Sequence, residues 1–405
     1  MFDLPNSARP DCRRPRLNTA VLATLVLIAV ACSGGQGWTD VNERAKQAHQ
    51  EGRDEEAEAL WQDALKIAEE TGDEMQQIMT LNNLGEFHRS RGRLDQAVSH
   101  YLQALEIFER QPDTNESELA TSYDQMATHL RLAGDFERAM EYYDKALKMR
   151  EAALGTDAPE VADTLNNMGL LAYLQGDLDR AQEHYERSIT GIENRRLANH
   201  PNMALALTNL AQVHQARGNY DQAEELFRRA LKIWIGNEGD SSARVAQSQV
   251  NLAELLRLAS KMDEAEKLYT RALEIFEEET GPDSPEVAAV LNNRALLYRL
   301  EKRYDEAETD YRRAVAIAES QLSSGHPEFA TMLFNFARLY DDRGMFEEAA
   351  PLYERALEMY TSTLGPDNRN VVMVLEKYSA SARAAGRDDL ARELNDRLEA
   401  LRGDG

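Results

Sequence analysis

Residues 281–317 read GPDSPEVAAVLNNRALLYRLEKRYDEAETDYRRAVAI, and related phrases recur along most of the 405-residue chain. Each copy contains an alanine at the end of a tripeptide resembling DEA, and we use this alanine as the anchor of its copy. The anchors are Ala57, Ala97, Ala139, Ala181, Ala223, Ala265, Ala307, Ala349 and Ala391. The first spacing is 40 residues and the other seven are 42. The chain is therefore predicted to be an array of repeated structural units.

Other positions keep a fixed distance from the anchor. A large aromatic residue lies four residues after it in eight copies, and a small residue lies seven after it, as Tyr311 and Ala314 do for Ala307. Small residues on one helical face allow neighbouring helices to approach closely, and the aromatic side chain fills the space between them. The second half of each copy is therefore predicted to be a helix buried along this face.

The residues before the anchor predict a turn and another helix. Glycine lies five residues before it in seven of the nine copies, with Ser260 and Lys302 as the exceptions. Glycine suits the left-handed conformation that ends a helix. An acid two residues before the anchor suits the start of the next helix, where it can cap N–H groups and meet the positive end of the dipole. Four prolines suit a first helical turn: Pro159, Pro201, Pro285 and Pro327.

These columns resemble the tetratricopeptide repeat, and the 42-residue period is similar to that of the kinesin-light-chain type. The phrases GPDSPEVAAVLNNRALLY and YDEAETDYRRAVAI carry the resemblance. It implies an all-α fold, an α-solenoid of about nine helix-turn-helix repeats forming a right-handed superhelix whose first helices line a concave groove. The array is predicted to span residues 40–401, followed by a short tail at 402–405.

An amide column lies fourteen residues before the anchor in seven successive copies, although asparagine is a poor helix former. Its members are Asn83, Gln125, Asn167, Asn209, Asn251, Asn293 and Asn335. A rotation of about 100° per residue places this column opposite the packed positions, which the resemblance makes the concave groove. Amides can both donate to and accept from the backbone of an extended peptide. We predict a peptide-binding groove, and the alternative is that the amides bond neighbouring repeats together.

An arginine column lies eight residues before the anchor. Its predicted binding members are Arg89, Arg131, Arg257 and Arg299. Leucine follows the column at Leu132, Leu174, Leu258 and Leu300. Basic and apolar groups at the groove would suit an extended partner segment with acidic and leucine-like side chains. The alternative is that these arginines pair with acidic residues of adjacent repeats, since surface ion pairs are common and weak.

The N-terminus predicts export. A basic segment with Arg13, Arg14 and Arg16 precedes an apolar run over 20–31, which is too short to span a bilayer and is typical of a secretory signal. The following Ala29-Val30-Ala31-Cys32 resembles the lipobox of bacterial lipoproteins. The resemblance implies a signal peptide at 1–31, lipidation of Cys32, and a tether within 32–39.

Cysteine usage agrees with this interpretation. Cys12 would leave with the signal peptide, so Cys32 would be the one cysteine of the mature chain, without an internal disulfide. Ser33 follows it, whereas aspartate there is the familiar inner-membrane retention signal of enteric bacteria. We therefore predict a lipid anchor in the cell envelope, at the outer membrane.

Composition and motifs disfavour several classes of function. A formal net charge of −25 disfavours binding to nucleic acid through the overall field. The sequence has no spaced metal-ligand cluster, phosphate-binding glycine loop or GxSxG elbow, so we expect neither an enzyme nor a cofactor. The predicted function is a membrane-anchored scaffold for a protein or peptide partner. Two alternatives stay open, a cytoplasmic adaptor of the kinesin-light-chain type and a purely structural, self-associating array. The oligomeric state is not predicted.

Overall fold

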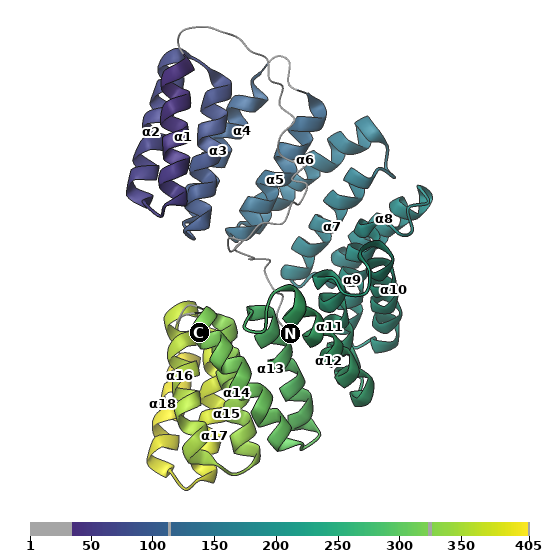
Figure 1. Ribbon diagram of the computed structural model, residues 1–405, viewed down its shortest axis with the longest axis vertical. Helices are drawn as coiled ribbons and strands as arrows, with labels where there is room; N and C mark the ends of the chain where they lie inside the picture. Colours follow the sequence, from purple (N-terminus) through teal and green to yellow (C-terminus); the bar gives the residue numbers. More distant parts are fainter. Residues whose placement is uncertain (1–34, 112–114, 323–325, 404–405) are drawn as a thin grey trace. The chain divides into compact units, whose positions relative to one another are not determined.

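The computed structural model describes residues 35–111, 115–322 and 326–403, and Cys32 lies outside them. Within these ranges the chain forms eighteen helices and no strand (Figure 1). Helix α1 packs against α2, and from α4 to α18 each helix packs against the next, which confirms the predicted all-α solenoid of helix-turn-helix repeats. None of the helices in these ranges is long and apolar enough to cross a bilayer.

Each repeat consists of a first and a second helix. The first helices are α1 (Gly35–Gln50), α3 (Glu74–Ser90), α5 (Glu116–Leu132), α7 (Pro159–Leu174), α9 (Pro201–Ala216), α11 (Ala243–Leu258), α13 (Pro285–Leu300), α15 (Pro327–Asp342) and α17 (Arg369–Ala384). The second helices are α2 (Asp54–Thr71), α4 (Leu94–Glu109), α6 (Phe136–Leu154), α8 (Leu178–Asn194), α10 (Tyr220–Glu238), α12 (Met262–Glu279), α14 (Tyr304–Gln321), α16 (Phe346–Leu364) and α18 (Asp388–Gly403).

The contacts divide the chain into two compact units, residues 1–87 and 88–405. In the first unit α1 pairs with α2, and Trp38, Trp61 and Phe87 are buried in small clusters. In the second unit each helix from α4 onward packs against the next, and one large core runs through the repeats from α7 to α18. Helix α1 begins at Gly35, inside the predicted tether, and α18 extends to Gly403, two residues beyond the predicted end of the array.

The repeat columns have the predicted packing roles. The anchor alanines are 0–2% exposed. The aromatic residues four positions later are almost completely buried where they are Tyr143, Tyr185, Phe227, Tyr269, Tyr311 and Tyr353. All seven glycines of the glycine column have positive φ, and Ser260 and Lys302 take the same left-handed conformation, with φ of 61° and 62°. The turn geometry is therefore kept even where the preferred residue is missing.

Helix starts follow the predictions only in part. All four prolines occupy the first turn of their helices, as expected. The acidic column also lies within the first turn of the second helices, where the helix dipole favours it. The expectation that it caps the helix was wrong, because the N-cap residue lies two positions earlier. Asp135 and Asp177 provide side-chain caps there.

Gly169 provides a test of how tightly the two helices of one repeat pack together. A Cβ atom at this position would lie 2.6 Å from Cε1 of Tyr185, whose side chain is only 1% exposed. Gly169→Ala is expected to destabilise the protein by about 1–2 kcal/mol, because overpacking outweighs the gain in helix propensity. The matched control is Gly236→Ala in α10, where a Cβ atom would meet nothing within 4 Å and the variant should be slightly more stable. Urea unfolding measures both variants, and a Gly169→Ala variant as stable as the wild type would refute tight packing.

Candidate partner-binding face

The first helices of successive repeats contact one another directly in the second unit, where α5 contacts α7, α7 contacts α9, α11 contacts α13, and α13 contacts α15. We call the surface shared by these first helices the first-helix face. Both predicted binding columns lie on first helices. The structure therefore brings the amides and the arginines to the boundaries between repeats.

Four members of the amide column donate hydrogen bonds to the preceding repeat. Nδ2 of Asn209 donates to Oδ1 of Asn166 at 2.9 Å, and the other three bonds connect equivalent positions. They run from Asn83 to Asn42 (3.0 Å), from Asn167 to Asp124 (3.2 Å) and from Asn335 to Asn292 (3.1 Å). The neighbouring Asn166 and Asn167 therefore have different partners, because Asn166 accepts from the following repeat and Asn167 donates to the preceding one.

Two amides depart from this pattern for a clear reason. The residues to which Asn251 and Asn293 would donate are Thr208 and Val250, which do not offer an amide or carboxylate oxygen. Asn251 instead accepts from Nε2 of Gln247 on its own helix at 3.1 Å, and Asn293 accepts from its neighbour Asn292 at 3.3 Å. Gln125 is exposed. The structure thus shows bonding between repeats for part of the column, while peptide binding by these amides stays a prediction.

The arginine column is not uniform. Arg299 is 5% exposed and donates to Oδ2 of Asp342 in the next repeat at 2.9 Å, which is the pairing alternative. Arg257 is partly buried, with an Nη2 atom 3.9 Å from Glu254 on its own helix. Arg131 is also partly buried and Arg89 is exposed. Arg299 is therefore paired with the following repeat.

The leucines beside this column are exposed. Their exposed fractions are 41% for Leu132, 39% for Leu174, 37% for Leu258 and 47% for Leu300. Each is the last residue of a first helix, so the four form a recurring apolar feature at one end of the first-helix face. Large exposed side chains that recur in register favour contact with another molecule.

Arg338 on α15 was missed by the sequence prediction. It lies eleven residues before its anchor, at a position that is Lys46 in the first copy and uncharged or acidic in the others, so the position does not form a basic column. Its side chain is partly buried, and burial and the nearby charge of Arg299 lower its pKa. The guanidinium approaches the ring of Phe334, with a distance of 5.9 Å to the ring centroid.

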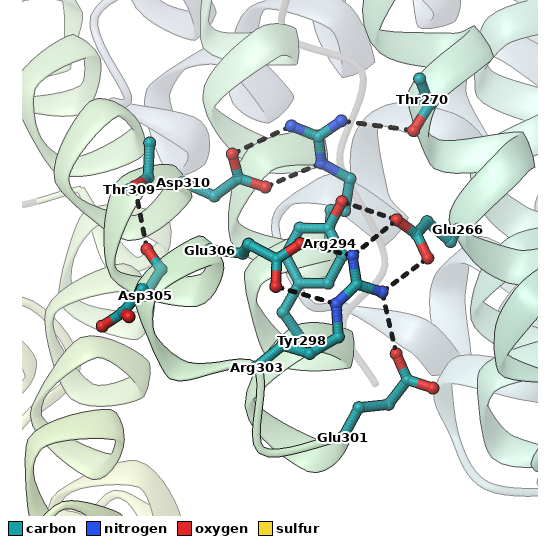
Figure 2. A network of polar contacts seen from close by, with 10 residues as sticks. All are labelled: Glu266, Thr270, Arg294, Tyr298, Glu301, Arg303, Asp305, Glu306, Thr309 and Asp310. Atoms are coloured by element: carbon teal, nitrogen blue, oxygen red, sulfur yellow. Dashed lines mark hydrogen bonds and ion pairs between the residues drawn. The ribbon is translucent and has the colours of Figure 1, made fainter.

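Two further polar networks hold the repeats together. Figure 2 shows Arg294 of α13 bonded to both carboxylate oxygens of Asp310, at 2.7 and 2.9 Å, beside a cluster in which Glu266 accepts from Tyr298 and Arg303. Arginine–glutamate pairs thirty-six residues apart connect successive second helices. They are Arg187–Glu151, Arg229–Glu193, Arg313–Glu277 and Arg355–Glu319.

Comparison with known families identifies the repeats. The tetratricopeptide-repeat model matches residues 36–110, 76–152, 118–194, 160–236, 244–320, 286–362 and 328–402. The chain belongs to the tetratricopeptide-repeat family. None of the curated proteins compared with it matches.

Several solved structures are similar to this tetratricopeptide-repeat chain. The apo form of RapI is 16% identical, with a TM-score of 0.54 over 70% of this chain and 97% of RapI. A tetratricopeptide-repeat protein from Parabacteroides merdae is 18% identical, with a TM-score of 0.50 over 75% and 99%. The kinesin-light-chain-like repeats from Podospora anserina are 23% identical, with a TM-score of 0.45 over 51% and 97%. At these identities the similarity shows the fold alone.

The first-helix face carries both polar and apolar side chains that are able to contact another molecule. Within the described ranges, histidine, cysteine and acidic side chains do not gather in groups of three that could hold a metal ion. The face offers exposed leucines, guanidinium groups and amides, which are the groups that recognise apolar and acidic side chains and peptide backbone.

Proposed function

We propose that this protein is an interaction scaffold that binds an extended segment of a protein partner on its first-helix face. The observation that carries the proposal is the recurrence of exposed leucines at the ends of first helices, which follow a buried or partly buried arginine on α5, α11 and α13. A tetratricopeptide-repeat array suits this role, since stacked repeats present an extended surface. The extended partner would place apolar side chains on the leucines and acidic ones near the arginines.

The leucines provide the direct test. The variant Leu258→Ser/Leu300→Ser is expected to lose at least about 90% of partner capture in a pull-down by the full chain from solubilised bacterial envelopes, because apolar contact area is removed. Its melting temperature should stay close to that of the wild type, since both leucines are already exposed. The control is Ile235→Ser, which removes a side chain of similar exposure, 40%, from a second helix. Equal capture by the leucine variant and the control would contradict binding at this face.

We also propose that the scaffold is held at the cell envelope by a lipid on Cys32, at the outer membrane. The support for this proposal is the sequence alone, from the basic segment and apolar run to the lipobox-like residues. The array begins only a few residues later, at Gly35 in α1. A lipid at Cys32 would therefore hold the first repeat close to the bilayer surface, since each residue of extended chain spans at most about 3.5 Å.

Cys32→Ser is expected to abolish the anchor, because the thiol that would carry the lipid is missing. The protein should then move from the membrane fraction to the soluble fraction, or accumulate as the unprocessed precursor. Fractionation and intact-mass measurement of the N-terminus detect either outcome. Ser33→Ala is the control and should stay with the membrane. Unchanged membrane association of Cys32→Ser would exclude a lipid at this residue.

A further inference from the structure

We propose that the solenoid contains a hinge at the junction between its fifth repeat, α9 and α10, and its sixth repeat, α11 and α12. The hinge separates one arm, formed by α5 to α10, from a second arm formed by α11 to α18. In a repeat array each repeat contacts only its neighbours, so the stiffness of a junction depends on the links made at that junction. Two kinds of link that recur at other junctions are replaced here by bonds within single helices.

The first of these links is the hydrogen bond between amide side chains of successive first helices. Asn209 and Asn335 each donate to an asparagine of the preceding repeat, at 2.9 and 3.1 Å. At the fifth–sixth junction the acceptor position is Thr208, whose hydroxyl donates within its own helix. Asn251 accepts instead from Gln247, also on its own helix. In addition, α9 contacts α11 less extensively than α7 contacts α9, so the first helices of the two arms are weakly joined.

The second link is the arginine–glutamate pair between successive second helices. Such pairs lie at the junctions before and after this one, as Arg229–Glu193 and Arg313–Glu277. In α10 the equivalent glutamate position is Ile235, which is 40% exposed. Arg271 therefore pairs with Glu274 on its own helix, at 3.0 Å. The series of ion pairs is interrupted between α10 and α12.

The core of α11 beside the junction is also irregular. Oε1 of Gln249 and Oγ of Ser248 are buried without a hydrogen bond among the described residues, and such unpaired polar atoms weaken a core. Thr164, which is equivalent to Ser248, accepts from Arg150 of the preceding repeat at 2.5 Å. The matches to the tetratricopeptide-repeat model leave out residues 237–243, between α10 and α11. At the position of Gln249 other copies have leucine: Leu165, Leu207, Leu291 and Leu333.

Other contacts keep the two arms together and place the pivot. Helix α10 packs against α11 within the large core. Near the start of the second helices, Lys261 pairs with Glu224 and Arg228 with Glu264, each at 2.7 Å. The arms therefore stay joined at this edge, while the other end of α10, where Ile235 lies, can slide against α12. Sliding of packed helices is a recognised form of motion between rigid parts.

The other junctions keep at least one link. Asn293 resembles Asn251 in bonding within its own helix, but its junction has the pair Arg313–Glu277. At the last junction, Tyr378 of α17 donates to Glu354 of α16 at 2.8 Å. Among the described residues from α5 onward, the fifth–sixth junction is thus the one interior junction that lacks both the amide link and the arginine–glutamate link.

The hinge does not depend on the proposed binding function, but it affects how a partner could bind. Leu174 on α7 and Leu258 on α11 lie on opposite sides of the junction. A segment that contacts both leucines has to match the angle between the two arms. Binding of such a segment would therefore restrict the motion of the hinge.

Pulsed electron paramagnetic resonance on spin-labelled pairs tests the hinge. The full chain is used with both native cysteines exchanged for serine, and two exposed residues at the same repeat position, two repeats apart, are changed to cysteine and labelled. The distance distribution of the pair across the hinge should be at least about twice as wide as those of two flanking pairs. Equal widths would overturn the hinge. The pair across the hinge is Lys232→Cys/Ala316→Cys, and the flanking pairs are Lys148→Cys/Lys232→Cys and Glu274→Cys/Glu358→Cys.

Restoring the missing links should remove the motion. Thr208→Asn supplies the acceptor that Asn166 and Asn292 provide at other junctions, and Ile235→Glu supplies the glutamate for Arg271. Thr208→Asn/Ile235→Glu should narrow the distribution across the hinge to the width of the flanking pairs. The control Ile235→Lys repels Arg271 and should leave the distribution wide.

Stability measurements keep this test decisive. Circular dichroism establishes that each variant is folded, and Ile235→Glu alone, at an exposed position, should narrow the distribution in part if the double variant does not fold. A folded Thr208→Asn/Ile235→Glu variant with an unchanged wide distribution would overturn the assignment of the hinge to these missing links. Equal narrowing by Ile235→Lys would overturn the assignment to the ion pair.

Discussion

Arg294→Leu is expected to destabilise the protein by about 3–5 kcal/mol, because it leaves the carboxylate of Asp310 buried without its partner. The two side chains are only 16% and 8% exposed, and both oxygens of Asp310 accept from the guanidinium. The same change also removes the contact between Arg294 and the hydroxyl of Thr270. Urea unfolding followed by circular dichroism measures the loss.

Other copies of the repeat indicate which second substitution should compensate for the loss of Arg294. The positions equivalent to Arg294 and Asp310 are both leucine in two other copies, as Leu210 with Leu226 and Leu252 with Leu268. Arg294→Leu/Asp310→Leu is therefore expected to recover the wild-type stability or exceed it, as buried ion pairs replaced by packed apolar groups often do. A double variant as unstable as the single one would show that the surrounding core cannot accept leucine, and the account of the pair would fail.

The fold could be predicted from the sequence because its determinants recur every 42 residues. A single copy of the repeat would not predict the backbone conformation of Lys302. Its place in the glycine column predicts a left-handed conformation, and its φ of 62° confirms this prediction. Similarly, alanines at the anchor positions predict close approach of helices, and they are buried in every repeat. Periodic positions experience nearly the same surroundings, so each copy supports the interpretation of the others.

The contacts on the first-helix face could be predicted only in part. Helical rotation places Asn209 away from the packed face, yet its partner Asn166 lies on another helix and depends on the distance and rotation between repeats. Arg299 shows the same limit, because its partner Asp342 lies in the next repeat. Arg338 does not belong to a basic column. The periodic pattern therefore did not indicate that the charge of Arg299 would lower the pKa of Arg338.

The amide column offers a comparison between side chains with the same position in the repeat and different bonds. Asn167→Ala/Asn209→Ala/Asn335→Ala removes three hydrogen bonds between repeats. Each deletion removes the amide donor from a buried or partly buried acceptor oxygen, so we expect a loss of about 1 kcal/mol each, or about 3 kcal/mol in total. Thermal and urea unfolding should both register this loss in the absence of any partner.

Asn251→Ala/Asn293→Ala is the matched control, because neither amide donates to the preceding repeat. Alanine has the better helix propensity, so this variant should melt at the wild-type temperature or slightly above it. It also separates the two roles of the column. If the amides bind a partner backbone, partner capture by the control variant should fall although its stability does not. Full capture by a stable control variant would show that the amide column serves only to bond neighbouring repeats together. A stability loss in the control as large as that of the triple variant would contradict the assignment of the bonds.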